Sequence, residues 1–203
     1  MAMFRTEQFT SPLCRISYAH GLYTEMKDDD GKPNGKYGVT LLFPASAKAV
    51  LQKAVGEAVT GQWGDKGVER FKNGLIKNPI LDHTHKGART KDGDFKEGMG
   101  EDVLFIRPTS NEPISCFDPK VLPMDGKGIK SGWWGKAVLN AFAWENSKNG
   151  DGVSFGISMW QHVKEDDVLG GDGGDPNKFF QAETVDTDDK GSENTGGAAD
   201  MFS

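Results

Sequence analysis

The feature that most constrains the fold is a pair of long alternating segments near the end of the chain. Residues 132–144 (GWWGKAVLNAFAW) and residues 153–164 (VSFGISMWQHVK) each place apolar side chains at every second position. The residues between them (ENSKNGDG) are rich in Asn, Gly and Asp, which favour turns. Because successive side chains of a strand point to opposite faces, this pattern predicts an antiparallel hairpin with one side against a core.

Three more strands are expected before this hairpin. They share a loose alternation of apolar and polar residues and are bounded by Gly, Pro, Asn or Asp: residues 11–26, 36–43 and 101–107. Strands that do not alternate regularly with helices argue against a parallel α/β sheet. The fold class is therefore mainly β, as a small antiparallel barrel or a sandwich of five strands.

One amphipathic helix is expected over about residues 46–60. Alanine, valine and leucine recur there at helical spacing, with Lys, Gln and Glu on the other side. Pro44 ends the strand before it and Gly61 marks its end. Residues 62–100 mix Gly, Lys and Asp with few apolar residues, so they are expected to form a long insertion with little regular structure.

The net charge of −6 hides a strong asymmetry along the chain. Residues 165–203 hold eleven acidic and two basic side chains, whereas residues 1–164 hold 19 acidic and 22 basic ones. Residues 172–203 are also too poor in apolar side chains to offset the entropy cost of ordering them. We therefore expect a domain over residues 1–171, mildly basic up to residue 164, and an acidic, disordered C-terminal tail over residues 172–203.

The outward side of the predicted hairpin combines aromatic rings with cations and amides. Assigning the apolar positions of residues 153–164 to the core leaves Trp160 outside, as the first candidate for stacking on a base. The outward set from both strands is Trp160, His162, Lys164, Lys136, Asn140, Phe142 and Trp144. Such a surface suits single-stranded nucleic acid, because bases stack on rings and cations hold phosphates. If both sides of the hairpin are covered, some of these rings belong to the core instead.

Other candidate sites are weak. Lys36 and Arg107, on neighbouring strands, are further candidates for phosphate contact. Asp82, His83 and His85 form only a fragment of a metal site, and no catalytic or phosphate-binding motif is found, so we expect no enzyme, metal or cofactor.

Cys14 and Cys116 are expected to be reduced and buried, as in a cytosolic protein without a secretory leader or membrane span.

Several short motifs resemble a known family, the phage single-stranded-DNA-binding proteins. The resemblance covers roughly residues 10–171 and is strongest over residues 132–171. It rests on the following motifs: Leu41-Leu42-Phe43-Pro44 before the helix, Trp133-Trp134-Gly135-Lys136, Ala141-Phe142-Ala143-Trp144, Gly152-Val153-Ser154-Phe155-Gly156-Ile157, Gln161-His162-Val163 and Leu169-Gly170-Gly171. Phe142 and Trp144 stand where tyrosines are common in the family.

The resemblance implies an OB-type barrel, a five-stranded antiparallel Greek-key barrel with one helix, that binds single-stranded DNA without reading its sequence. It also implies a role in phage DNA replication or recombination in the host cytoplasm, and it leaves a homodimer open. The tip, Asp200-Met201-Phe202-Ser203, resembles the acidic tail ends that dock onto phage or host replication proteins and compete with DNA. Ser203 departs from tails that end in Phe itself.

Two other functions remain open from the sequence. The first is a structural or assembly protein of the virion, in which the barrel packs into an oligomer and the outward rings form its interfaces. The second is a small hydrolase or nuclease that uses Asp82, His83 and His85 with a divalent metal.

Overall fold

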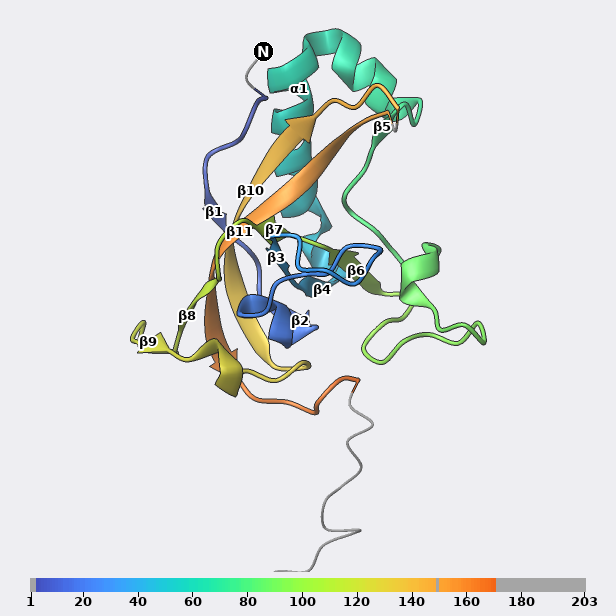
Figure 1. Ribbon diagram of the computed structural model, residues 1–203. Coiled ribbons are helices and arrows are strands. Elements are labelled where there is room, and N and C mark those ends of the chain that lie inside the picture. The colour runs from blue at the N-terminus through green and yellow to red at the C-terminus, as the bar shows by residue number, and fades with distance from the viewer. Residues whose placement is uncertain (1–2, 149, 171–203) are drawn as a thin grey trace, which may run out of the picture. The chain divides into compact units, whose positions relative to one another are not determined.

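The hairpin expected near the end of the chain is the largest element of the fold (Figure 1). In the computed structural model, which describes residues 3–148 and 150–170, its strands are β10 (Trp134–Trp144) and β11 (Asp151–Lys164). They pair antiparallel along their whole length, from Trp134 opposite Lys164 to Trp144 opposite Gly152.

A barrel closes around this hairpin. β10 pairs with β2 (Cys14–Ser17), β2 with β4 (Thr40–Pro44), and β4 with β6 (Val103–Ile106), all antiparallel. β6 leads after two residues into β7 (Thr109–Ser110), which pairs with β11 and returns the sheet to the hairpin. The spatial order of the first four strands is 4-1-2-3, a Greek key, and the fifth strand closes the barrel. The expected OB-type barrel is confirmed.

The sheet contains parallel as well as antiparallel pairs, and all the parallel pairs described involve β11. This strand is long, and its second edge is covered by three short parallel partners, β5 (Ile76–Lys77), β7 and β8 (Ser115–Phe117). The remaining short strands are antiparallel: β1 (Phe9–Thr10) on β10, β3 (Tyr37–Gly38) on β7 and β9 (Pro123–Met124) on β8. Covering an edge in this way satisfies its backbone groups and blocks pairing with other chains.

The helix is longer than its sequence pattern predicts. α1 runs over Lys48–Lys72 and contains a break at Gly64, whose φ of 60° is not helical. Trp63, Val68 and Phe71 continue its packing against the core beyond Gly61. The first part of the expected insertion is therefore helical, which corrects the predicted end near residue 60.

The rest of the insertion is tied to the barrel. Leu81 exchanges two backbone hydrogen bonds with Phe105 of β6, at N–O distances of 2.9 and 2.8 Å. Leu42, Ala88, Phe105 and Leu169 form a small second core beneath it. Four short 3₁₀ turns complete the elements: η1 (Ala19–Leu22), η2 (Ala45–Ala47), η3 (Lys86–Ala88) and η4 (Gly126–Gly128).

Two β-bulges interrupt β11, and the first reverses its alternation. Val138 lies opposite Met159 and Leu139 opposite Ile157, so Ser158 is an extra residue without a partner. An extra residue turns the following side chains to the other face of a strand. As a result Ile157 is buried as expected, but Met159 is 41% exposed and Trp160 is completely buried.

Candidate nucleic-acid interface

The outward face of β10 is as the sequence predicts. Its inward side chains, Ala137, Leu139, Ala141 and Ala143, are all buried. The outward side chains are Trp134, Lys136, Val138, Asn140, Phe142 and Trp144, and across the hairpin they lie opposite Lys164, Gln161, Met159, Gly156, Ser154 and Gly152, respectively. Three aromatic rings thus lie on the outward face of one strand, two of them at successive outward positions about 7 Å apart.

A groove of about 450 Å³ opens at Phe142. Two other predicted residues line it, Lys36 and Asn140, although they come from different strands. Arg5 also lines it, because a bridge between Arg5 and Phe142 holds the start of the chain beside β10. The guanidinium carbon of Arg5 is 5.2 Å from the centre of the Phe142 ring, within cation–π range. No sequence pattern points to Arg5, which precedes the first regular strand.

The floor of the groove is made of small and polar groups. Asn140 is 6% exposed and leans over Gly156, where a Cβ atom would lie 2.6 Å from its Oδ1. Its Nδ2 has no hydrogen-bond partner among the described residues. At the rim, Gln8 Nε2 donates to Ser158 Oγ at 3.1 Å. Glu112 is the one acidic side chain among the residues that line this groove.

Trp144 has a fixed orientation next to the groove. Its ring lies directly over Gly152 on the opposite strand, where a Cβ atom would have no room. Its indole Nε1 donates a hydrogen bond to Ser154 Oγ at 3.0 Å. Lys77 Nζ lies 5.6 Å from the ring centre, so this ring, like that of Phe142, has a cation beside it.

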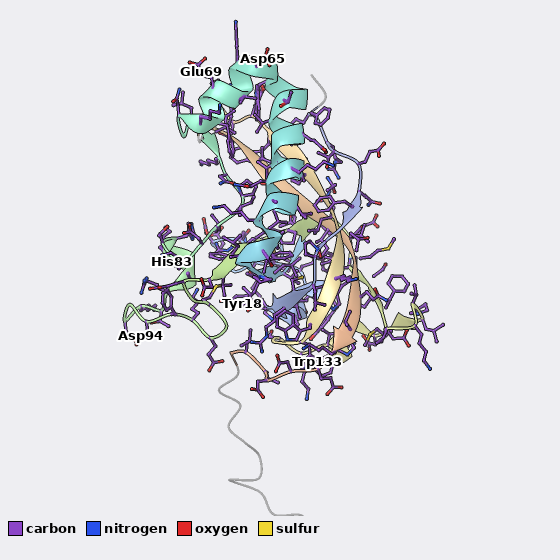
Figure 2. The ribbon with its side chains drawn as sticks, turned by 180° about the vertical axis from the view of Figure 1, so that it is seen from behind. Tyr18, Asp65, Glu69, His83, Asp94 and Trp133 are labelled. Atoms are coloured by element: carbon purple, nitrogen blue, oxygen red, sulfur yellow. The ribbon has the colours of Figure 1, made fainter. Side chains whose placement is uncertain are left out.

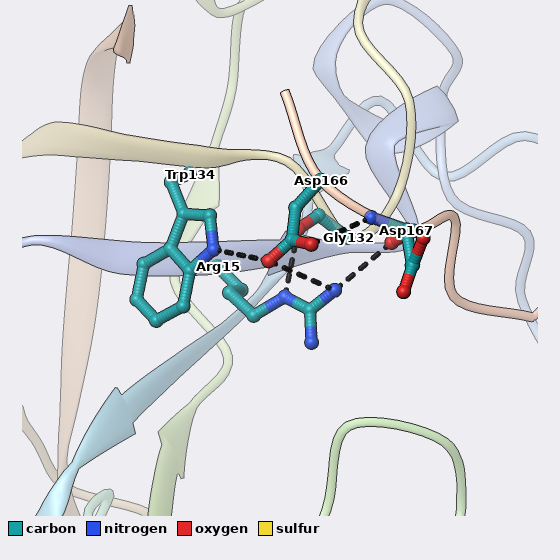
Figure 3. A network of polar contacts seen from close by, with 5 residues as sticks. All are labelled: Arg15, Gly132, Trp134, Asp166 and Asp167. Carbon is teal, nitrogen blue, oxygen red and sulfur yellow. Dashed lines mark hydrogen bonds and ion pairs between the residues drawn. The ribbon is translucent and has the colours of Figure 1, made fainter. Parts of the chain in front are cut away.

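The third ring, Trp134, is engaged within the protein (Figure 3). Its Nε1 donates to Asp166 at 2.6 Å, and Arg15 lies 3.7 Å from the same carboxylate. Arg15 also donates to the carbonyl oxygens of Gly132 at 2.7 Å and Asp167 at 2.9 Å. The Trp134 hydrogen bond, helped by a backbone hydrogen bond from Asp167, lowers the pKa of Asp166 from its ordinary value. The predicted Lys164 is exposed at this end, 5.2 Å from the Trp134 ring centre.

Two predicted stacking or contact residues are not on the outward face. Trp160 is 0% exposed and packs over Gly135 in the core, because the bulge at Ser158 turns it inward, so the expectation that it stacks on bases is wrong. His162 lies opposite Gly135, on the same inward side. Its ring is half-buried, with its centre 4.8 Å from that of Trp133.

Arg107 is exposed but lies outside the groove at Phe142. It lines a second cleft of about 310 Å³, together with Tyr18 and His20. Its guanidinium carbon is 5.5 Å from the centre of the Phe105 ring. Lys136 is exposed on the outward face of β10, between the two ends described above.

The fragment at Asp82, His83 and His85 serves local structure. Asp82 Oδ1 accepts hydrogen bonds from the backbone and the hydroxyl of Thr84, and His85 Nδ1 accepts one from Gly87 N. Within residues 3–148 and 150–170, no group of three or more His, Cys, Asp or Glu is placed to hold a metal ion.

Cys14 and Cys116 are both free and buried, as expected. Burial raises the pKa of the Cys14 thiol to about 12. In the same part of the chain, no helix is long and apolar enough to cross a membrane. The predicted partner-binding residues Asp200, Met201 and Phe202 lie outside the described residues.

Solved structures with a similar fold come from phages. The single-stranded DNA-binding protein of bacteriophage Enc34 in complex with ssDNA is 19% identical, with a TM-score of 0.58 over 80% of this chain and 89% of that one. Another structure of the Enc34 protein is 18% identical, with a TM-score of 0.54 over 89% of this chain and all of that one. Gp2.5, a single-stranded DNA-binding protein encoded by bacteriophage T7, is 14% identical, with a TM-score of 0.53 over 91% of this chain and all of that one.

At these identities the similarity concerns the fold, so family membership rests on the sequence itself. A comparison with curated protein sequences finds no match. The sequence profile of one family does match, over residues 8–190, and its description is "Enterobacter phage Enc34, ssDNA-binding protein". The match spans most of the chain and includes the whole barrel. The chain therefore belongs to the family of the phage Enc34 ssDNA-binding protein.

Proposed function

We propose that this protein binds single-stranded DNA, without reading its sequence, on the outward face of β10 around Phe142 and Trp144. The observation that carries the proposal is the pair of rings at successive outward positions, each with a cation beside it, one of which, Phe142, lines a groove. Family membership and the Enc34 protein's structure with ssDNA support the same ligand.

The geometry suggests how a strand is held. A base stacks on the face of Phe142 that Arg5 now covers, and the displaced guanidinium pairs with a neighbouring phosphate. Lys36 and Lys136 are exposed on the two sides of this position and neutralise further phosphates. Rings and cations contact features that all nucleotides share, so this part of the site does not discriminate strongly between bases.

We further propose that the protein coats single strands during phage DNA replication or recombination in the host cytoplasm. The acidic residues 172–203 would occupy the basic surface when DNA is absent, and Asp200, Met201 and Phe202 would bind a replication protein. Charge supports this part, since residues 172–203 are strongly acidic whereas residues 1–164 hold three more basic than acidic side chains. Removing residues 172–203 is expected to tighten DNA binding at low salt. Unchanged low-salt affinity in the truncated protein would rule out the competition.

Fluorescence anisotropy with labelled oligo-dT tests the main proposal. The full chain is expected to bind oligo-dT more tightly than a duplex of the same length, with an affinity that falls as salt rises. Phe142→Ala should weaken this binding, while Tyr23→Ala, an exposed tyrosine that lines neither described cleft, should not. Equal affinity for duplex and single strand, or equal effects of the two variants, would contradict the proposed site.

A further inference from the structure

The groove at Phe142 is the first of three adjoining clefts. Thr109 of β7 lines both this groove and the second cleft, of about 310 Å³. Tyr18 and His20 line the second cleft and also a third, of about 420 Å³. The hollowed surface is thus continuous from Phe142 across β7 to the far side of Tyr18. Figure 2 shows Tyr18 in the lower half of the view, well below Asp65 and Glu69 of α1.

Tyr18 is presented by an unusual backbone. Its φ and ψ of 57° and 45° are left-handed, a conformation that bulky residues rarely adopt. The turn after it is locked, because Ala19 N donates to Ser131 Oγ at 3.0 Å and Gly21 packs directly on the Gly38 backbone. Nevertheless the Tyr18 side chain is 48% exposed. A rigid turn in a costly conformation therefore holds an aromatic ring in solvent, between two clefts.

Cations also line these clefts, as they line the groove at Phe142. Lys27 and Arg107 line the second cleft, and within residues 3–148 and 150–170 no acidic residue lines it. Lys96 lines the third, where Glu97 is the one acidic residue among the described lining residues. The Glu97 carboxylate already accepts a hydrogen bond from Gly170 N at 2.6 Å. Aromatic ring and cations thus occur together here, as they do at Phe142.

We propose that the single strand bound at Phe142 continues over β7 and stacks a second base on Tyr18, with Arg107 and Lys27 on its phosphates. This inference rests on the proposed DNA binding and adds a second stacking site to it. The His20 ring lies edge-on to that of Tyr18, with the two ring centres 6.2 Å apart. With both contacts, the bound DNA crosses the barrel from Phe142 to Tyr18. A site at Phe142 alone would hold the DNA at one point only.

The test uses a variant that keeps the backbone and removes the ring. Tyr18→Gly suits the left-handed conformation, so folding is retained while stacking is lost. Tyr18→Phe keeps the ring, and Tyr23→Ala removes an exposed tyrosine that lines none of the three clefts. Affinity for a 16-nucleotide oligo-dT and the number of nucleotides covered per protein on poly-dT are measured for each. Thermal melting monitors the fold.

Tyr18→Gly is expected to lose about five-fold or more in affinity, the equivalent of one stacked base, and to cover fewer nucleotides per protein. Tyr18→Phe and Tyr23→Ala should match the unmodified protein in both measurements. If Phe142→Ala weakens binding while Tyr18→Gly changes neither affinity nor the length covered, the Tyr18 contact is absent but the proposed function stands. If the unmodified protein does not bind oligo-dT, the proposed function itself fails.

Discussion

The two strands of the long hairpin, β10 and β11, show how far an alternating pattern can be trusted. Both alternate in sequence, and they pair along their whole length. β10 keeps one alternation from Trp134 to Trp144, so its outward face carries the rings that the pattern places there. β11 contains a bulge at Ser158, and from there on its buried and exposed positions exchange. Two tryptophans with similar sequence surroundings, Trp144 and Trp160, therefore have different roles.

The largest expected effect is a difference in stability between variants of these two tryptophans. Trp160→Ala should lower the free energy of unfolding by about 3–5 kcal/mol, because it removes a completely buried ring from the core. Urea denaturation measures this loss, and Trp144→Ala, at a half-buried outward position, is the matched control. A loss for Trp160→Ala no greater than that for Trp144→Ala would mean that Trp160 is not in the core. DNA affinity per folded molecule should stay unchanged in Trp160→Ala.

The next effect is a loss of DNA affinity when a ring on β10 is removed. Phe142→Ala should weaken oligo-dT binding by about 1–3 kcal/mol, because one stacked base loses its ring. Its effect on unfolding should be clearly smaller than that of Trp160→Ala, since Phe142 is half-buried. Titration by anisotropy and urea denaturation of the same preparation test both parts. An unchanged affinity would remove Phe142 from the site.

A smaller change is expected for a single phosphate contact on β10. Lys136→Ala should make the dependence of log affinity on log salt concentration shallower by about 0.7, the value for one phosphate on a single strand. Lys66→Ala, at an exposed position of α1 that lines none of the three clefts, is the control. The contact is refuted if the two variants have the same salt dependence as the unmodified protein.

The smallest effect tests the bulge itself. Simple alternation puts Met159 in the core, but the bulge leaves it 41% exposed, so Met159→Ser should change the unfolding free energy by no more than about 0.5 kcal/mol. Ile157→Ser, two residues earlier and 4% exposed, should cost several times more. Similar losses in both variants would show that the alternation continues through Ser158.

The fold was largely predictable because its main strands are local patterns. The five longer strands, the helix start and the hairpin turn each depend on residues close together in sequence. A bulge does not, because the extra residue at Ser158 is defined only by its register against Val138 and Leu139. The same limit applies to α1, whose extension past Gly61 depends on the packing of Trp63 and Phe71 against the core.

The candidate site was predictable only on β10. Phe142, Trp144, Asn140 and Lys136 follow from one strand's alternation, whereas the groove joins Phe142 and Asn140 to Arg5 and Lys36 through tertiary contacts. Tyr18 was missed because nothing in its neighbours indicates a left-handed backbone at a residue other than glycine. Trp134 has the same sequence features as Trp144, and only the contact with Asp166 shows that it is engaged elsewhere.

Photo-crosslinking tests the central claim most directly. The full chain is bound to oligo-dT that carries 5-iodouracil, irradiated and digested with trypsin, and the modified residues are identified by mass spectrometry. Cleavage after Lys136, Lys148 and Lys164 separates β10 from β11, so residues 137–148 and 149–164 are recovered as different peptides. We expect crosslinks at Phe142 or Trp144 and none at Trp160. Crosslinks at Trp160, with Phe142 and Trp144 unmodified, would contradict the account.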